Sequence, residues 1–289
     1  MRPQRRPPVI DDVPITVFRR CDARAAGWTD EQIYACFLRV FHGVYTTPTT
    51  PLTHVLKCAA AALTVPEDSV ITGRSAPTLR GVDLAGFGDP VEVIVPNPDL
   101  MMRRKGLRCS AVRVAEFEHS SWRGVGVAGF PRIAFDLLKQ RSITQAVAHC
   151  DALLHAGVIT ADEIAGFLVG RHDHGIRRAR LRVPYLDGRA ESVPESVLRV
   201  EFVLRGMHPV PQLEVFDGDR FVARLDLAFE EAEVAADPAQ AEHDRVRRDR
   251  LRALGWTVIV VTNDRLRDHV DEVIAEVAAA LGGRSGKAA

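Results

Sequence analysis

The C-terminal third of this 289-residue chain carries the sequence pattern that most limits which folds the chain can adopt. Apolar periodicity and turn residues predict helices at 194–205, 241–254 and 264–281, and strands at 212–216, 220–229, 233–236 and 256–262. Asp217-Gly218 is a hairpin turn signal between the first two strands. The order helix, three strands, helix, strand, helix predicts a compact α/β domain over residues 186–282.

Three acidic residues of this predicted domain are candidates for a metal site. Glu195 falls in the first turn of the first helix, Asp226 late in the second strand and Asp237 just past the third. Hydrolysis of a phosphodiester with Mg²⁺ needs carboxylates that converge on one ion, which polarises the phosphate and activates water. We therefore expect these three residues to be catalytic and to hold Mg²⁺. The alternative is that they are ordinary surface charges.

The segments around these acids resemble a known family. They are Pro194–Ser196 (PES), Arg224–Phe229 (RLDLAF), Val234–Asp237 (VAAD), His243 and Arg248–Trp256 (RDRLRALGW). They are similar to actinobacterial endonuclease-like proteins of the domain-of-unknown-function 559 family, relatives of the very-short-patch repair (Vsr) endonucleases in the restriction-endonuclease-like PD-(D/E)xK superfamily. The resemblance implies an endonuclease fold in which Asp226 and Asp237 take the places of the family's strand acids and His243 assists catalysis.

The chain departs from the family pattern at one end of this motif. Asp237 replaces the family Glu, and Pro238, Ala239 and Gln240 replace its Tyr, Asp and Gly. An aspartate keeps a metal ligand but shortens its reach by one methylene, and loss of the second Asp empties a catalytic position. Two alternatives therefore stay open: an active Mg²⁺-dependent DNA endonuclease with a partly degenerate site, and an endonuclease fold that no longer cleaves.

Residues 14–50 predict a small winged helix-turn-helix. A helix is expected at 15–26, then a capping box of Thr29 with Gln32, a second helix at 30–40 and a strand pair at 41–47. On the second helix, the candidates for DNA contact are Gln32, Tyr34 and Arg39. Asp30 and Glu31 suit the helix dipole but repel phosphate, so a winged helix kept for protein contact is the alternative.

This N-terminal region also resembles a family. Ala25–Thr29 (AAGWT), Ile33 and Phe41–Tyr45 (FHGVY) are similar to the AbiEi-type antitoxin proteins, as are Val70–Ala76 and Arg132–Leu137 downstream. The resemblance implies a winged helix that binds DNA, represses a toxin operon and works with a cognate toxin protein. Residues 51–185 then correspond to a mixed α/β middle region of an AbiEi-like protein.

A basic cluster closes the middle region before the break at Pro184 and Asp187-Gly188. Its arginines Arg177, Arg178 and Arg180 are candidates for phosphate contacts. A solvated helix face is an equal alternative.

Composition bounds the setting of the protein. The formal net charge is zero, which argues against a protein whose whole surface binds nucleic acid by charge alone. The five cysteines form no C-x-x-C motif, and no apolar run approaches the ~20 residues of a membrane span. We therefore expect a cytoplasmic α/β multidomain protein without a membrane anchor.

The function that we expect is DNA binding of the toxin–antitoxin or defence type, with a C-terminal domain that hydrolyses DNA with Mg²⁺. The first alternative is a non-catalytic AbiEi-like antitoxin that represses transcription at an operator or binds a toxin. The second is an antitoxin that binds only its toxin and does not touch DNA.

Overall fold

The computed structural model of the chain describes residues 16–238 and 245–285, and these form two compact units. The first unit holds the described residues up to Leu137 together with Gly166–Arg171, and the second holds Leu138–Ala165 and the residues from His172 onward. Within the described residues the chain is mixed α/β and contains three sheets.

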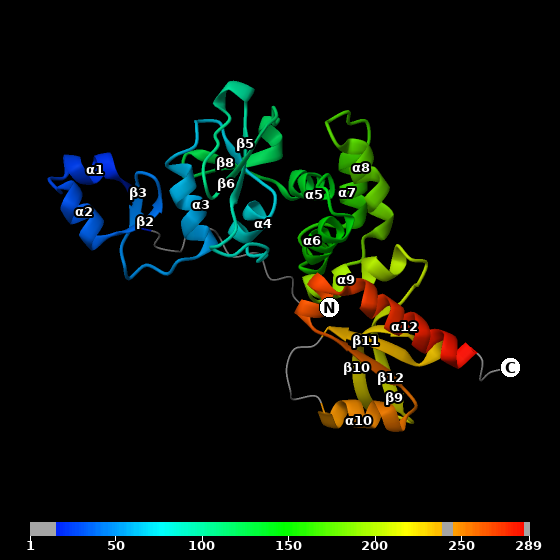
Figure 1. Cartoon of the computed structure of the whole chain (residues 1–289). Coiled ribbons are helices and arrows are strands. Elements are labelled where there is room, and N and C mark those ends of the chain that lie inside the picture. The colour runs from blue at the N-terminus through cyan, green and yellow to red at the C-terminus, as the bar shows by residue number, and fades with distance from the viewer. Residues whose placement is uncertain (1–15, 239–244, 286–289) are drawn as a thin grey trace. The chain divides into compact units, whose positions relative to one another are not determined.

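The first unit begins with a three-stranded antiparallel sheet and two short helices, drawn in blue in Figure 1. In chain order these are β1 (Val17–Arg19), α1 (Arg20–Ala25), α2 (Asp30–Cys36), β2 (Leu38–Phe41) and β3 (Val44–Thr46), with β3 in the centre of the sheet. The capping box is confirmed, because the Thr29 amide donates to Gln32 Oε1 (2.9 Å) and the Gln32 amide donates to Thr29 Oγ1 (3.2 Å).

Both predicted helices of this region are longer than the observed ones. The stretch 17–19 pairs with β3, so the first helix starts only at Arg20. The second helix ends at Cys36 because the next residues pair with β3 from its other side. Helix periodicity in 15–26 and 30–40 therefore came partly from strand residues, whose apolar side chains line the same small core.

The second sheet of this unit has five strands in the order β6-β5-β4-β8-β7. They are β4 (Val70–Ile71), β5 (Val91–Val95), β6 (Leu107–Ala111), β7 (His119–Trp122) and β8 (Val125–Ala128). The helices around it are α3 (His54–Ala62), α4 (Ser75–Leu79) and α5 (Phe130–Leu138), whose last residue already belongs to the second unit. These elements agree with the mixed α/β region that the sequence predicted for residues 51–185. The first strand of the β7–β8 hairpin, His-Ser-Ser-Trp, lacks a run of apolar residues.

A buried ion network holds α5 to this sheet. The fully buried Arg132 guanidinium donates to Glu118 (3.1 Å) and Asp136 (2.9 Å). Asp136 also accepts from the Thr72 hydroxyl (2.6 Å), and Glu118 accepts from Arg171 (2.8 Å). A buried charge is costly unless it is paired and hydrogen-bonded, and here each carboxylate has at least two donors.

The second unit contains a four-stranded sheet in the order β12-β11-β10-β9. Its strands are β9 (Val210–Asp217), β10 (Arg220–Phe229), β11 (Val234–Pro238) and β12 (Thr257–Val261). The first three run antiparallel, and β12 lies parallel to β11. The helices are α6 (Ile143–His155), α7 (Ala161–Leu168, shared with the first unit), α8 (Ile176–Arg182), α9 (Val193–Val203), α10 (Arg245–Ala253), α11 (Asn263–Asp268) and α12 (Val270–Ser285).

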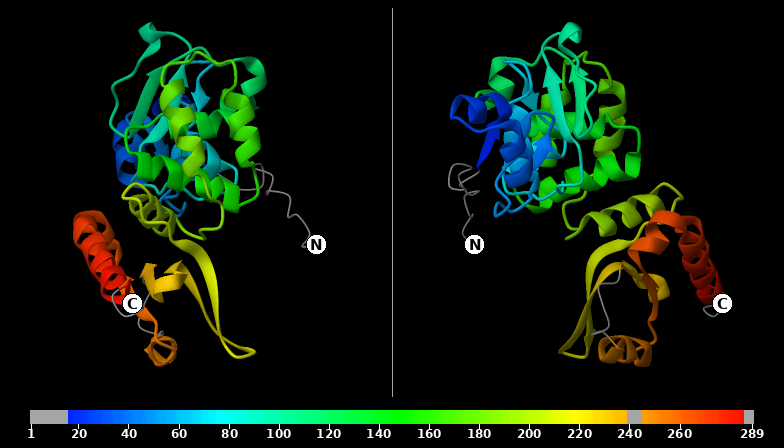
Figure 2. Two further views of the ribbon diagram at one scale, coloured as in Figure 1. Left: turned by 90° about the vertical axis from the view of Figure 1, so that its right-hand side faces the viewer. Right: turned by 60° about the vertical axis from the view of Figure 1, so that its left-hand side comes forward.

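This element order is the one that the C-terminal sequence predicted, except that the closing helix breaks at His269 into α11 and α12. Helices cover both faces of the sheet, as Figure 2 allows the reader to follow. On one face α9 and α12 pack on a cluster that includes Leu227 and Ala236. On the other face Leu251 of α10 packs on a cluster that includes Ala228 and Ala235.

Helix α6 packs against α9, so it belongs with the C-terminal unit. The contact contains a buried ion pair between Asp151 and Arg199 (2.8 Å), and Arg199 also donates to the Tyr185 carbonyl (2.6 Å). The sequence placed a domain boundary after residue 185, whereas residues 138–165 and 172–185 lie in the same unit as the following sheet.

No helix within the described ranges is both long enough and apolar enough to cross a membrane.

Candidate functional site

The candidate site of the second unit centres on two aspartates on neighbouring strands. Leu227 of β10 pairs with Ala236 of β11, so the next position of this antiparallel register sets Asp226 opposite Asp237. Side chains alternate along β11, so Asp237 shares the α10 face of the sheet with Ala235. Both aspartates are half-buried. The two predicted strand acids are therefore cross-strand neighbours.

Glu195 reaches the same part of the sheet through Gln212. The Glu195 side chain sits in the first turn of α9 and is only 7% exposed. Its Oε2 accepts from the Glu191 amide (3.0 Å) and from Gln212 Nε2 (2.9 Å). Gln212 lies between Pro211 and Leu213, the β9 partners of Leu227 and Leu225, so its place is opposite Asp226.

Gln212 is a residue that sequence reasoning missed. A glutamine within a strand matches no metal or catalytic motif, and its backbone φ of +55° is rare for a residue other than glycine. Its Oε1 is buried and has no hydrogen-bond partner within the described residues. An orphaned buried acceptor beside carboxylates is an oxygen that a cation or a water molecule would satisfy.

The donor set fits a magnesium ion of the two-carboxylate kind. Mg²⁺ is usually held by one or two carboxylates and keeps several waters, and here Asp226, Asp237 and Gln212 Oε1 would be its protein ligands. A denser cage is absent: no three His, Cys, Asp or Glu side chains in the described part of the chain are placed to hold a metal ion. Glu195 is already engaged by its two hydrogen bonds. The predicted His243 lies outside the described residues.

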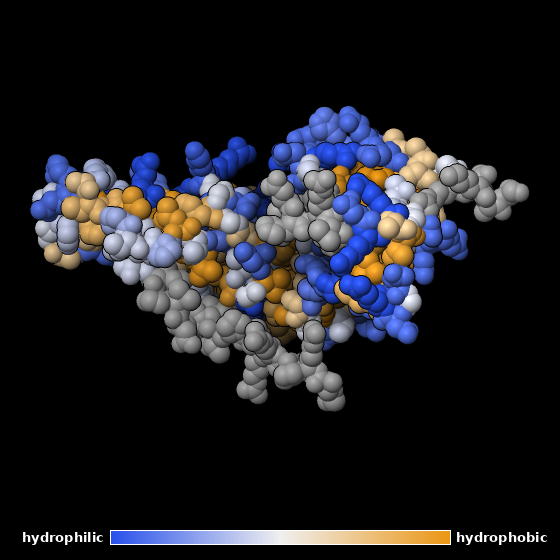
Figure 3. Space-filling view, turned by 90° about the horizontal axis from the view of Figure 1, so that it is seen from below, coloured by the Kyte–Doolittle hydropathy of each residue, from blue (hydrophilic) through white to orange (hydrophobic). Residues whose placement is uncertain are grey.

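Helix α10 contacts β10, the strand of Asp226, and the tip of the β9–β10 hairpin lies near α10. Arg250 and Arg252 of α10 are exposed, and Figure 3, which views the chain from below, shows hydrophilic side chains over this part of the unit. Near the hairpin tip, Phe216 and Phe221 are about half exposed and pack edge to face, with ring centroids 5.8 Å apart. Arg220, Phe221 and Arg250 line a hollow of about 220 Å³ between the hairpin and α10.

The three residues predicted to contact DNA from one N-terminal helix do not all lie on that helix. Gln32 uses its side chain for the capping box, and Tyr34 is exposed on α2. Arg39 was placed on the second helix, but it lies on β2 opposite Tyr45 because that stretch pairs with β3. Tyr34 still neighbours it, since the Tyr34 and Tyr45 rings are 6.2 Å apart.

Arg20 lies beside Tyr34 and was not singled out from the sequence. Its Nη1 donates to the Tyr34 hydroxyl (3.0 Å), and its Nε lies 3.9 Å from Asp30. The result is an exposed patch of Arg20, Tyr34 and Arg39. A signal was present, since Arg19-Arg20 begins a helix whose partner helix carries an exposed tyrosine.

The basic cluster before the last domain lies on α8. Arg177, Arg178 and Arg180 are exposed, and Arg178 donates to the Lys139 carbonyl (2.9 Å). Arg182 is different, because it is buried and donates to the carbonyls of residues 138, 140 and 141 at 2.6–2.9 Å. Only the first three can reach a phosphate.

Comparison with known proteins places the chain beside mycobacterial proteins. No family model matches it. The uncharacterized proteins MT2308 and Rv2248, from two strains of Mycobacterium tuberculosis, are each 28% identical to it over 259 residues, which is 83% of this chain and 91% of the relative. Among solved structures it is similar to the RV2827C protein of Mycobacterium tuberculosis, with a TM-score of 0.40 and 13% identity over 72% of this chain and 86% of that one.

Proposed function

We propose that this chain is a cytoplasmic DNA-binding protein of the toxin–antitoxin or defence type, whose C-terminal unit hydrolyses DNA with Mg²⁺. The observation that carries the proposal is the antiparallel register of β10 and β11, which sets Asp226 opposite Asp237. Bound there, the ion would polarise a phosphodiester and lower the pKa of the attacking water. The C-terminal unit is then an endonuclease fold of the Vsr-like, PD-(D/E)xK kind.

Each side chain of the proposed site has its own role. Asp226 and Asp237 hold the ion. Glu195 orients Gln212, because it accepts the Nε2 hydrogen and so leaves Oε1 as the free acceptor of the amide. Arg250 and Arg252 on the neighbouring helix supply positive charge for the DNA backbone, which dominates the affinity of proteins for DNA. His243 keeps its proposed assisting role.

Plasmid nicking tests this proposal. Supercoiled plasmid is incubated with Mg²⁺ or Mn²⁺ and the wild type, Asp226→Asn or Asp237→Asn, with Asp219→Asn at the exposed hairpin turn as the matched control. We expect nicking by the wild type and the control, and a loss of about 100-fold or more in both site variants. Calorimetry with Mg²⁺ should show binding that both site variants lose. A wild type that neither binds metal nor nicks DNA would show that the fold is not a nuclease.

A second candidate function rests on the N-terminal patch of Arg20, Tyr34 and Arg39. There we propose a winged helix, as in AbiEi-like antitoxins, that binds operator DNA while the chain acts as a repressor without cleavage. Exposed arginines beside an exposed tyrosine suit contacts to the DNA backbone and bases. Gel shifts with DNA from upstream of the gene should weaken for Tyr34→Ala and Arg39→Gln and not for Arg103→Gln, an exposed arginine elsewhere in the unit.

A cognate toxin is the partner that we propose for either function. Co-expression with the product of an adjacent reading frame, followed by size-exclusion chromatography, measures whether a complex forms. A complex that forms equally well with the triple variant of Arg20, Tyr34 and Arg39, together with no DNA binding by the wild type, would favour the antitoxin that binds only its toxin. All five cysteines are free thiols, which supports the cytoplasmic setting of this proposal.

A further inference from the structure

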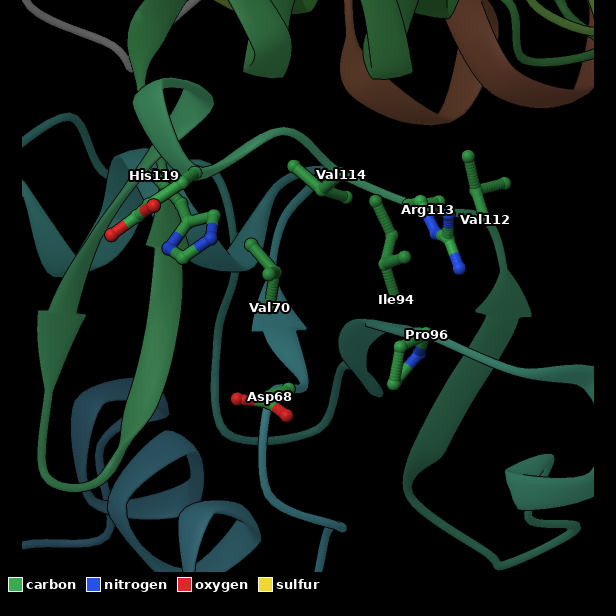
Figure 4. A pocket seen from close by; sticks show the side chains of 9 residues that line it. Asp68, Val70, Ile94, Pro96, Val112, Arg113, Val114 and His119 are labelled. Atoms are coloured by element: carbon green, nitrogen blue, oxygen red, sulfur yellow. The ribbon is translucent and has the colours of Figure 1, made fainter.

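The first unit contains a pocket on one face of its five-stranded sheet, remote in sequence from every residue of the proposed site. Its volume is about 310 Å³, at the small end of the range of ligand pockets. The floor is apolar: Val70 of β4 and Ile94 of β5 are direct cross-strand partners and are buried. Figure 4 shows these two side chains between His119 on one side and Arg113 on the other.

Charged side chains of both signs surround this floor without pairing to one another. The pocket is lined by the exposed residues Asp68, Glu116 and Arg113. Within the described residues none of these three side chains makes a hydrogen bond or an ion pair. The buried Arg132 of the same unit, by contrast, is paired with both Glu118 and Asp136. Unpaired opposite charges around one hollow are groups that a ligand can use.

One wall of the pocket has an unsatisfied polar atom. Nδ1 of His119 is buried and has no hydrogen-bond partner in the described part of the chain. The ring sits over Gly126, where an added Cβ would come within 2.9 Å of both His119 Nδ1 and Val70 Cγ2. Glycine at this position therefore makes room for the ring.

The walls are held in place before any ligand binds. Glu118, between Glu116 and His119, is buried and bonded to Arg132 and Arg171. On the opposite side, Asp68 holds a left-handed φ of +63° just before β4, a strained conformation that clusters at functional sites. Fixed walls lower the entropy that a small ligand loses on binding.

We propose that this pocket binds a small zwitterion with an apolar body, that is, a free amino acid with an aliphatic or aromatic side chain. Arg113 binds the carboxylate, Asp68 or Glu116 binds the ammonium group, and the side chain packs on Val70 and Ile94. Two carboxylates against one guanidinium give these three side chains a formal net charge of −1. That charge disfavours a dianionic phosphate ligand and favours a neutral zwitterion. The inference does not depend on the proposed function.

Calorimetry on the full chain, with L-leucine and L-phenylalanine as probes, tests whether the pocket binds a free amino acid. L-leucinamide lacks the carboxylate and N-acetyl-L-leucine lacks the ammonium group, so each should bind about tenfold more weakly than leucine, or worse. Arg113→Gln should weaken leucine binding by a similar factor. The matched control is Arg103→Gln, an exposed arginine that does not line the pocket.

Three outcomes would overturn the proposal. In the first, neither amino acid binds at millimolar concentration to protein whose circular dichroism shows it folded. In the second, leucine binds but Arg113→Gln binds it as tightly as Arg103→Gln does, which places the site elsewhere. In the third, adenosine or AMP binds more tightly than both amino acids, which shows that the ligand is a nucleoside or nucleotide and not a zwitterion.

Discussion

Gln212 donates its side-chain amide to Glu195 across 2.9 Å, from a backbone position that is strained for any residue with a side chain. The hydrogen bond ties β9 to the first turn of α9. It also fixes which end of the amide remains available, because the nitrogen is used and Oε1 is left without a partner. A strained residue that orients one buried oxygen is the arrangement expected of a positioning group.

Replacement of Gln212 by glycine separates its backbone role from its side-chain role. Gln212→Gly relieves the positive φ but removes the amide, so stability should change little while Mg²⁺ affinity and nicking fall. Gln212→Leu keeps the strain and leaves Glu195 with one donor fewer, so the free energy of unfolding should also drop by about 1–3 kcal/mol. Urea unfolding and Mg²⁺ calorimetry measure the two effects. Unchanged Mg²⁺ binding in Gln212→Gly would remove this residue from the site.

Arg132→Leu should be among the most destabilising single changes in the first unit. It leaves Glu118 and Asp136 as buried carboxylates that have each lost a charged partner, and the cost of breaking a buried pair is about 3–5 kcal/mol. Arg171→Leu is the comparison, because that side chain is partly exposed and pairs with Glu118. Thermal melting of the two variants should therefore differ, with Arg132→Leu melting lower.

The Asp151 carboxyl should make stability depend on pH in the mildly acidic range. Burial raises the pKa of Asp151 to about 6, and Arg199 opposes that rise. The folded protein therefore holds this proton more tightly than the unfolded chain, whose carboxyl has a pKa near 3.9. As pH rises from about 4 to about 6, this group lowers the free energy of unfolding by up to about 3 kcal/mol. Asp151→Asn should flatten the slope of unfolding free energy against pH in that window.

Asp151→Asn also breaks the ion pair with Arg199, so the variant should be less stable at neutral pH. An unchanged slope between pH 4 and 6 would mean that another group titrates there.

The arginines of α8 should separate into two kinds. Arg177→Gln removes an exposed charge, so DNA affinity should fall and the slope of log K against log salt should decrease by about 0.9 if that arginine contacts a phosphate. Arg182→Gln removes a buried donor to three backbone carbonyls, so the melting temperature should drop. The slope of log K against log salt, measured on the folded protein, should stay the same. Fluorescence anisotropy at several salt concentrations measures both. Equal salt slopes for Arg177→Gln and wild type would leave α8 as a solvated face.

Sequence patterns predicted most elements of the fold because local signals and tertiary packing agree in them. Asp217-Gly218 is such a case, since it marks the observed β9–β10 turn. They failed where pairing partners decide the structure, as at Arg39, whose strand forms only because β3 lies beside it. Of the candidate site, the position of Asp226 in the second strand followed from the sequence, whereas Asp237, expected just past the third strand, lies within β11. Gln212 did not, because its relevance comes from a strained backbone and an orphaned oxygen that no motif encodes.

The path of the chain limits how this protein can be divided genetically. The boundary between the two units is crossed after Leu137, again after Ala165 and again after Arg171. A gene fragment that starts at residue 186 would also lack Asp151, the partner of the buried Arg199. Recombination that exchanges the C-terminal sheet alone would therefore leave an unpaired charge in the recipient. Functional swaps with related genes should be made with junctions that carry α6 together with α9.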